Sequence, residues 1–210
     1  VVAFGDSITD GTCSTLDAHD RWEDIVSMRL SLANATRKIA MVNEGIGGNT
    51  VTREGLTPPA VSTPGIERFD RDVLGHHGVS HVVFFMGTND INRAQTAARV
   101  IEGLSSLIAR TKAAGFKAIG VTILPRHQIA APDAPNPGWT PEKTAIRNEV
   151  NQWIRTKAAF DGVIDFDKVV RSPSDPNLLN PPFNCGDNIH PSPAGYFAMG
   201  NAVDLKLFAR

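Results

Sequence analysis

The sequence predicts an α/β protein in which a five-stranded parallel sheet lies between two layers of helices. Short apolar runs alternate with longer amphipathic segments along the chain, and this alternation favours parallel strands joined by helical crossovers. The run His81–Met86 is rich in Val and Phe, which is typical of a strand buried on both faces. No flexible polar linker interrupts the pattern, so we expect one domain over residues 1–210.

Each expected element has its own signal in the sequence. Apolar runs predict strands at Val1–Phe4, Ile39–Asn43, His81–Met86, Ala118–Ile123 and Val163–Phe166. Helical spacing of apolar residues predicts helices at Arg21–Ala33, Gly65–His76, Ala94–Ala114 and Pro141–Phe160, with a last one from Ser192 to about Phe208. Gly115 follows the longest helix as a terminator, and Thr140 precedes Pro141 as an N-cap.

Composition and charge exclude several classes of protein. The 210 residues are 41% hydrophobic and 20% charged, as in ordinary globular proteins. The net charge of -1 gives no basic surface for nucleic acid, and the apolar runs are strand-sized, so no membrane span is expected. No signal-peptide pattern precedes Val1, so a leader either was removed or never existed. Two cysteines are too few for a disulfide scaffold or a structural zinc site.

Polar, glycine-rich segments follow the predicted strands. Because open α/β sheets bind ligands beyond the carboxyl ends of their strands, these segments are expected to meet at one edge of the sheet. They are Gly5–Gly11, Asn43–Thr50, Gly87–Asp90 and, before the last helix, Asp187–Pro191. This edge is the candidate active site.

Ser7 and His190 are the candidate nucleophile and base. A serine hydroxyl attacks an ester only when a nearby base takes its proton. Asp187 lies three residues before His190, so its carboxylate can reach Nδ1 and leave Nε2 free to accept that proton. Taken alone, Ser7 is more typical of a helix N-cap, and an Asp-x-x-His pair is more typical of a capping or loop-bracing role. Thr9 replaces the second glycine of the Gly-x-Ser-x-Gly elbow, which argues against the α/β-hydrolase fold.

Gly48 and Asn89 are candidates for an oxyanion hole. A backbone N–H can serve only where no side chain blocks the approach, and an Asn amide supplies a second, neutral donor. Taken separately, a turn glycine and an asparagine that braces its own loop explain these residues equally well.

Together these residues resemble the SGNH hydrolases of the GDSL esterase/lipase superfamily, over essentially the whole chain. The family's conserved blocks are matched by Gly5-Asp6-Ser7, by Gly48, by Gly87-Thr88-Asn89-Asp90 and by Asp187-Asn188-Ile189-His190. Further stretches resemble an arylesterase- and acylhydrolase-like branch associated with xylan-degrading systems, namely Phe4–Ser14, Arg68–Val73, Asn148–Arg155 and Asp187–Tyr196.

The resemblance implies a flavodoxin-like, three-layer SGNH fold and a serine esterase that needs no metal or cofactor. Ser7 would attack, His190 would act as base, Asp187 would orient it, and Ser7, Gly48 and Asn89 would form the oxyanion hole. The implied substrates are short-acyl esters, such as acetyl esters of carbohydrates or small aryl esters. Alternatives are a lysophospholipase or thioesterase of the same superfamily, a metal phosphoesterase, for which a second histidine is missing, and a non-catalytic carbohydrate-binding domain.

In the implied fold, Cys13 and Cys185 border the same site, so we expect a disulfide between them. A disulfide would favour a secreted enzyme, although the sequence does not exclude the cytoplasm, and Asn34-Ala35-Thr36 is a possible glycosylation sequon. Loops Leu124–Pro141 and Leu178–Asn184 are expected to flank the cleft of a monomeric enzyme. Candidate pocket walls are Trp22, Trp139 and Phe183, for which ordinary loop packing is an equally good explanation.

Overall fold

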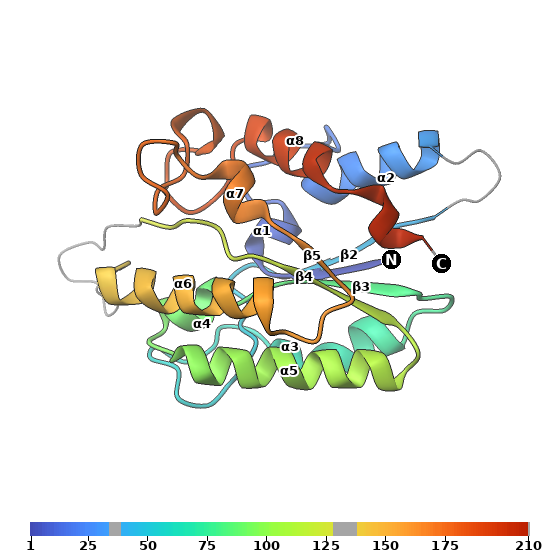
Figure 1. The fold of residues 1–210 in the computed structure, drawn as a ribbon, viewed down its shortest axis with the longest axis horizontal. Helices are drawn as coiled ribbons and strands as arrows, with labels where there is room; N and C mark the ends of the chain where they lie inside the picture. The colour runs from blue at the N-terminus through green and yellow to red at the C-terminus, as the bar shows by residue number, and fades with distance from the viewer. Residues whose placement is uncertain (34–38, 128–137, 210) are drawn as a thin grey trace.

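The computed structural model, which describes residues 1–33, 39–127 and 138–209, contains a parallel sheet with helices on both faces (Figure 1). The five strands are paired in the order β2-β1-β3-β4-β5, and every pair is parallel. They are β1 (Val2–Gly5), β2 (Val42–Gly45), β3 (His81–Phe85), β4 (Lys117–Val121) and β5 (Gly162–Ile164). This order is that of flavodoxin-like sheets, so the predicted fold class is confirmed.

The helices form two layers because the strands are apolar on both faces. On β3, Val82 and Phe84 belong to one core cluster, whereas Val83 and Phe85 belong to the other. The first cluster lies under α3 (Gly65–Phe69), α5 (Ala97–Ala113) and α6 (Pro141–Thr156), and the second under α2 (Trp22–Ala33), α7 (Phe166–Val170) and α8 (Pro193–Ala202) (Figure 1). None of the helices in the described ranges is long and apolar enough to cross a membrane.

Several boundaries differ from the sequence prediction. β2 begins three residues later than expected, because Val42 to Gly45 pair in register with Val2 to Gly5 of β1. The expected helix at residues 65–76 is α3 followed by a π-helical turn at Asp70–Leu74. The last helix stops at Ala202, where Val203 is extended, and a 3-10 turn at Leu205–Phe208 follows. The sequon at residues 34–36 and part of loop 124–141 lie outside the described residues.

Three short helices were not predicted. They are α1 (Ser7–Asp10), α4 (Thr88–Asn92) and α7 (Phe166–Val170), each of four or five residues. One helical turn is too short to show a 3.6-residue period in the sequence. All three begin within three residues of the end of a strand. Of these, α1 and α4 follow β1 and β3, beside the switch point, and contain Ser7 and Asn89.

The strand order places a switch point beside β1. From β1 the chain goes to β2 on one side of the sheet and later to β3 on the other. A crevice forms at such a reversal, just beyond the carboxyl ends of the strands. The segments that follow β1, β2 and β3 therefore emerge next to one another.

The end of β2 packs directly on the helix that carries Ser7. A Cβ added to Gly45 would overlap the backbone nitrogen of Asp10 and lie 2.6 Å from the carbonyl carbon of Thr9. Next to this contact, the Asn43 amide donates to the Thr9 carbonyl at 2.6 Å and its oxygen accepts from Gly45 N–H at 2.8 Å. Glycine at position 45 thus allows β2 to fix the position of α1.

We predict that Gly45→Ala lowers the free energy of unfolding by about 1–3 kcal/mol, since the new methyl group meets backbone atoms that have no room to move. Urea unfolding followed by circular dichroism measures the change. Gly47→Ala is the matched control, because a Cβ there meets only the Asp10 carboxylate at 3.7 Å. Equal stability of the two variants would show that β2 does not pack on α1 as described.

Candidate active site

Ser7 is held at the start of α1, immediately after β1. The Asp6 side chain caps this helix by accepting from Ile8 N–H at 3.0 Å, and Gly11 ends it in the left-handed region. Ser7 itself is 9% exposed. The tight change from strand to helix therefore presents the serine hydroxyl at the carboxyl end of a central strand.

A hydrogen-bonded line joins Ser7 to the two residues expected to activate it. Ser7 Oγ lies 2.8 Å from His190 Nε2, and His190 Nδ1 lies 2.5 Å from Asp187 Oδ2. Since the carboxylate accepts from Nδ1–H, Nε2 is left to accept the serine proton. Ser7 and His190 are 183 positions apart in the sequence, and the fold brings both of them together with Asp187.

The loop that carries His190 is shaped by Asp187. The other oxygen of this carboxylate accepts from the backbone N–H groups of Ile189 and His190, each at 2.9 Å. Partial burial alone would raise the pKa of Asp187, but these two bonds and the imidazole outweigh it and hold the pKa below its usual value. Asp187 therefore stays ionised and can stabilise a positive charge on His190.

The candidate oxyanion donors come from the segments after β2 and β3. Gly48 adopts a left-handed conformation, with φ of 70°. One N–H of the Asn89 amide donates to the Asn49 carbonyl at 3.0 Å, which fixes the plane of the amide and leaves its second N–H available. The two segments are thus joined to each other as well as to neighbouring strands.

Asp90, which follows β3, also binds the segment that follows β2. Its carboxylate, fully buried, accepts from Val51 N–H at 2.8 Å and from both Thr52 N–H and Thr52 Oγ1 at 3.0 Å. Burial raises the pKa of Asp90 to about 6, although those hydrogen bonds oppose the shift. The sequence does not identify Asp90 as a structural carboxylate, because that role has no signal of its own there.

Arg68 is a buried residue of the site that sequence reasoning missed. Its guanidinium donates to the carbonyls of Gly5 and Glu44 at 2.9 and 3.0 Å and to Asn49 Oδ1 at 3.1 Å. It also pairs with Asp72 at 2.9 Å and lies 3.9 Å from the centre of the Phe4 ring. Arg68 therefore connects the end of β1, which precedes Ser7, to the loop that contains Gly48.

The predicted disulfide between Cys13 and Cys185 is confirmed, with the two Cα atoms 6.3 Å apart. It ties the segment after Ser7 to the Asp187–His190 loop. Among the residues that the structure describes, one group of potential metal ligands lies close together, and its members are Cys13, Cys185 and Asp187. Because the sulfurs are bonded to each other, this set offers no thiolates for a metal.

The three predicted pocket walls have different positions. Trp22 is fully buried, with its ring 5.4 Å from that of Phe166 and 6.4 Å from that of Phe85, so it is a core residue and the prediction for it is wrong. Phe183 is half-buried and packs on the same core cluster. Trp139 is 7% exposed, lies 5.3 Å from the Arg126 guanidinium and borders a surface groove. Substrate contact by Phe183 and Trp139 stays a prediction.

A parallel α/β sheet with a hydrogen-bonded Ser–His–Asp line at its switch point is characteristic of serine hydrolases. The chain belongs to the GDSL-like lipase/acylhydrolase family, whose profile matches residues 3–198. Its class of activity is therefore ester hydrolysis. No protein with a curated description matches the sequence.

Solved structures share this fold at low sequence identity. A carbohydrate acetylesterase family member from Sinorhizobium meliloti is 18% identical, with a TM-score of 0.69, covering 96% of this chain and 93% of its own. A protein from Agrobacterium tumefaciens that is provisionally named an arylesterase is 23% identical, with a TM-score of 0.68 and coverages of 96% and 94%. A GDSL-like lipase from Bacteroides thetaiotaomicron is 20% identical, with a TM-score of 0.65 and coverages of 99% and 86%.

We predict that Arg68→Lys lowers kcat at least about tenfold with little change in KM, since a shift in Gly5 and Asn49 disturbs groups that act on the transition state rather than on bound substrate. Steady-state kinetics with 4-nitrophenyl acetate measures kcat and KM, and circular dichroism establishes that the variant is folded.

Arg110→Lys is the matched control for Arg68. Arg110 also lies over a ring of the same core, that of Phe69 at 4.7 Å, and bonds to Asp70, but it does not contact the strand ends. An unchanged kcat in folded Arg68→Lys would contradict the positioning role.

Proposed function

We propose that this protein is a serine esterase that hydrolyses short-acyl carboxylic esters through an acyl-enzyme intermediate. The observation that carries the proposal is the unbroken line from Ser7 Oγ to His190 Nε2, at 2.8 Å, and from His190 Nδ1 to Asp187, at 2.5 Å. A serine and a base within hydrogen-bonding distance, with the base oriented by a third group, are what nucleophilic catalysis requires.

In the first half of the proposed reaction, Ser7 Oγ bonds to the ester carbonyl carbon and its proton passes to His190 Nε2. Asp187 stabilises the resulting imidazolium, and the carbonyl oxygen becomes an anion that accepts from Ser7 N–H, Gly48 N–H and the Asn89 amide. The bond to the alcohol oxygen then breaks, and His190 returns the proton to the departing alcohol.

In the second half, water replaces the alcohol. His190 takes a proton from the water while the water oxygen attacks the acyl carbon. The N–H groups of Ser7, Gly48 and Asn89 stabilise the second oxyanion. The bond to Ser7 Oγ breaks, Ser7 regains its proton from His190, and the carboxylic acid leaves. Short acyl groups such as acetyl are supported by the fold shared with the carbohydrate acetylesterase family member.

We also propose that the enzyme works outside the reducing cytoplasm. The disulfide between Cys13 and Cys185 supports this location, because thiols in the cytosol of most organisms are kept reduced.

Ser7→Ala should abolish hydrolysis of 4-nitrophenyl acetate except for a small residual rate, since the nucleophile is lost while the oxyanion donors remain. Intact-protein mass spectrometry should also show one phosphonate adduct on the native enzyme and none on Ser7→Ala. Full activity of the variant would reject the mechanism, and a native protein that neither hydrolyses the ester nor reacts with the phosphonate would favour a binding domain.

Asn89→Ala should cost about 2.7–4 kcal/mol of transition-state stabilisation, which is a fall in kcat of about 100- to 1000-fold with little change in KM. Steady-state kinetics at saturating 4-nitrophenyl acetate tests the prediction. The thermal midpoint must be recorded alongside, because Asn89 also bonds to Asn49. Near-normal turnover in the folded variant would remove Asn89 from the oxyanion hole.

A further inference from the structure

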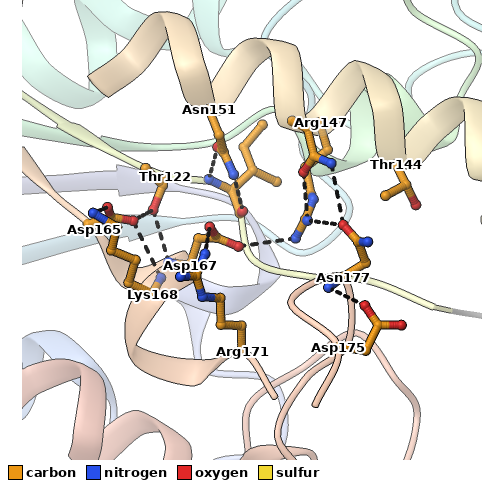
Figure 2. Close-up of polar contacts among 12 residues, drawn as sticks. Thr122, Thr144, Arg147, Asn151, Asp165, Asp167, Lys168, Arg171, Asp175 and Asn177 are labelled. Atoms are coloured by element: carbon orange, nitrogen blue, oxygen red, sulfur yellow. Dashed lines mark hydrogen bonds and ion pairs between the residues drawn. The ribbon is translucent and has the colours of Figure 1, made fainter. Parts of the chain in front are cut away.

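A surface groove of about 500 Å³ lies between the start of α6 and the loop that follows α7. Its volume is within the range of small-molecule binding sites. The helix side includes Trp139, Thr144 and Ala145, and the loop side includes Asp175 and Asn177. Figure 2 shows Thr144 on the helix and Asp175 on the loop, with the Asn177 side chain between α6 and that loop.

The wall of the groove is organised by Arg147, whose side chain is buried. Its guanidinium pairs with the buried Asp167 at 3.2 Å and donates to the amide oxygens of Asn148 at 2.8 Å and Asn177 at 3.1 Å (Figure 2). Because Arg donates only, both amide oxygens must turn toward it. The NH₂ group of Asn177 then points away from Arg147, and no described residue accepts from it.

Asp175 adds an acceptor to this wall. One carboxylate oxygen accepts from Asn177 N–H at 2.9 Å, which makes a tight turn, and the other has no hydrogen-bond partner in the described ranges. Across the groove, Thr144 Oγ1 accepts from the Trp139 indole at 2.9 Å. The groove thus combines a carboxylate acceptor, an amide donor and a hydroxyl with apolar surface from Trp139 and Ala145.

A backbone hydrogen bond connects the groove to the loop that carries His190. His127, which also borders the groove, donates its backbone N–H to the Asn188 carbonyl at 2.9 Å, two residues before His190. Next to it, the Arg126 guanidinium lies 5.3 Å from the Trp139 ring and 3.4 Å from Thr88 Oγ1, beside Asn89.

We propose that this groove binds the alcohol part of the ester and that this alcohol is a polyhydroxylated one, such as a sugar. The inference rests on the proposed function, in which His190 protonates the departing alcohol, so the alcohol leaves on the His190 side. Hydroxyl groups both donate and accept, which suits Asp175 and Asn177 together.

Other occupants fit the groove less well. An alkyl chain would bury Asp175 and Asn177 without hydrogen bonds, at a cost of desolvation. An anion would be repelled by the Asp175 carboxylate, which lines the groove. A neutral molecule with hydroxyl groups and a flat C–H face satisfies both the polar wall and Trp139.

The test compares acetates of alcohols with and without further hydroxyl groups. The first group contains methyl glycosides and xylo-, gluco- and manno-trioses that carry a single acetyl group on a secondary hydroxyl, and the second is cyclohexyl acetate. We expect kcat/KM of the native enzyme to be at least about tenfold higher for one of the sugar acetates. Ala145→Arg, which fills the groove, and Asp175→Asn, which keeps the turn, should each reduce that preference about tenfold, mainly through KM.

Gln152→Arg is the matched control for Ala145→Arg, since it adds the same charge to an exposed position of α6 that does not border the groove. The inference is overturned if no sugar acetate is preferred over cyclohexyl acetate, or if the groove variants leave the preference unchanged. Failure of the proposed function itself would be seen separately, as 4-nitrophenyl acetate hydrolysis that is absent or that survives Ser7→Ala.

Discussion

The guanidinium of Arg68 holds together the parts of the sheet on which the candidate site is built. It spans the carbonyls that end β1 and β2 and reaches the Asn49 side chain. Gly5 lies two residues before Ser7, and Glu44 and Asn49 lie on either side of Gly48 in the sequence. Burying an arginine is costly unless it is paired and hydrogen-bonded, and here the Asp72 carboxylate, two backbone carbonyls and the Asn49 amide oxygen accept from Arg68. The positions of those carbonyls define where a nucleophile and an oxyanion donor can stand.

The residues proposed to carry the reaction lie in two parts of the molecule, one attached to the sheet and one on a peripheral loop. Ser7, Gly48 and Asn89 follow three adjacent strands, and buried hydrogen bonds fix them to the sheet. Asp187 and His190 lie instead on a loop whose shape comes from its own carboxylate. The disulfide joins that loop to the residues after Ser7, so a covalent bond supplies the connection that sheet hydrogen bonds supply elsewhere.

The edge of the sheet on which the site lies was predictable from sequence, since parallel strands end at a common edge and the polar segments follow those strands. The role of Arg68 was not, because Arg68 and Asp72 have the spacing of an ordinary exposed ion pair and a sequence carries no measure of burial. The prediction for Trp22 failed for the same reason, because its indole is fully buried and packs on Phe85 and Phe166.

The buried carboxylates of Asp6 and Asp90 contribute more to the positions of backbone segments than to the stability of the fold. Burial raises the pKa of Asp6 to about 7, and that of Asp90 to about 6, so ionising either group in the folded state is unfavourable compared with the unfolded chain. Apolar residues would avoid this penalty, but they would leave the N–H groups of Ile8, Val51 and Thr52 without acceptors. Those N–H groups belong to the segments that carry Ser7 and follow Gly48, so the penalty accompanies the fixed positions that the chemistry requires.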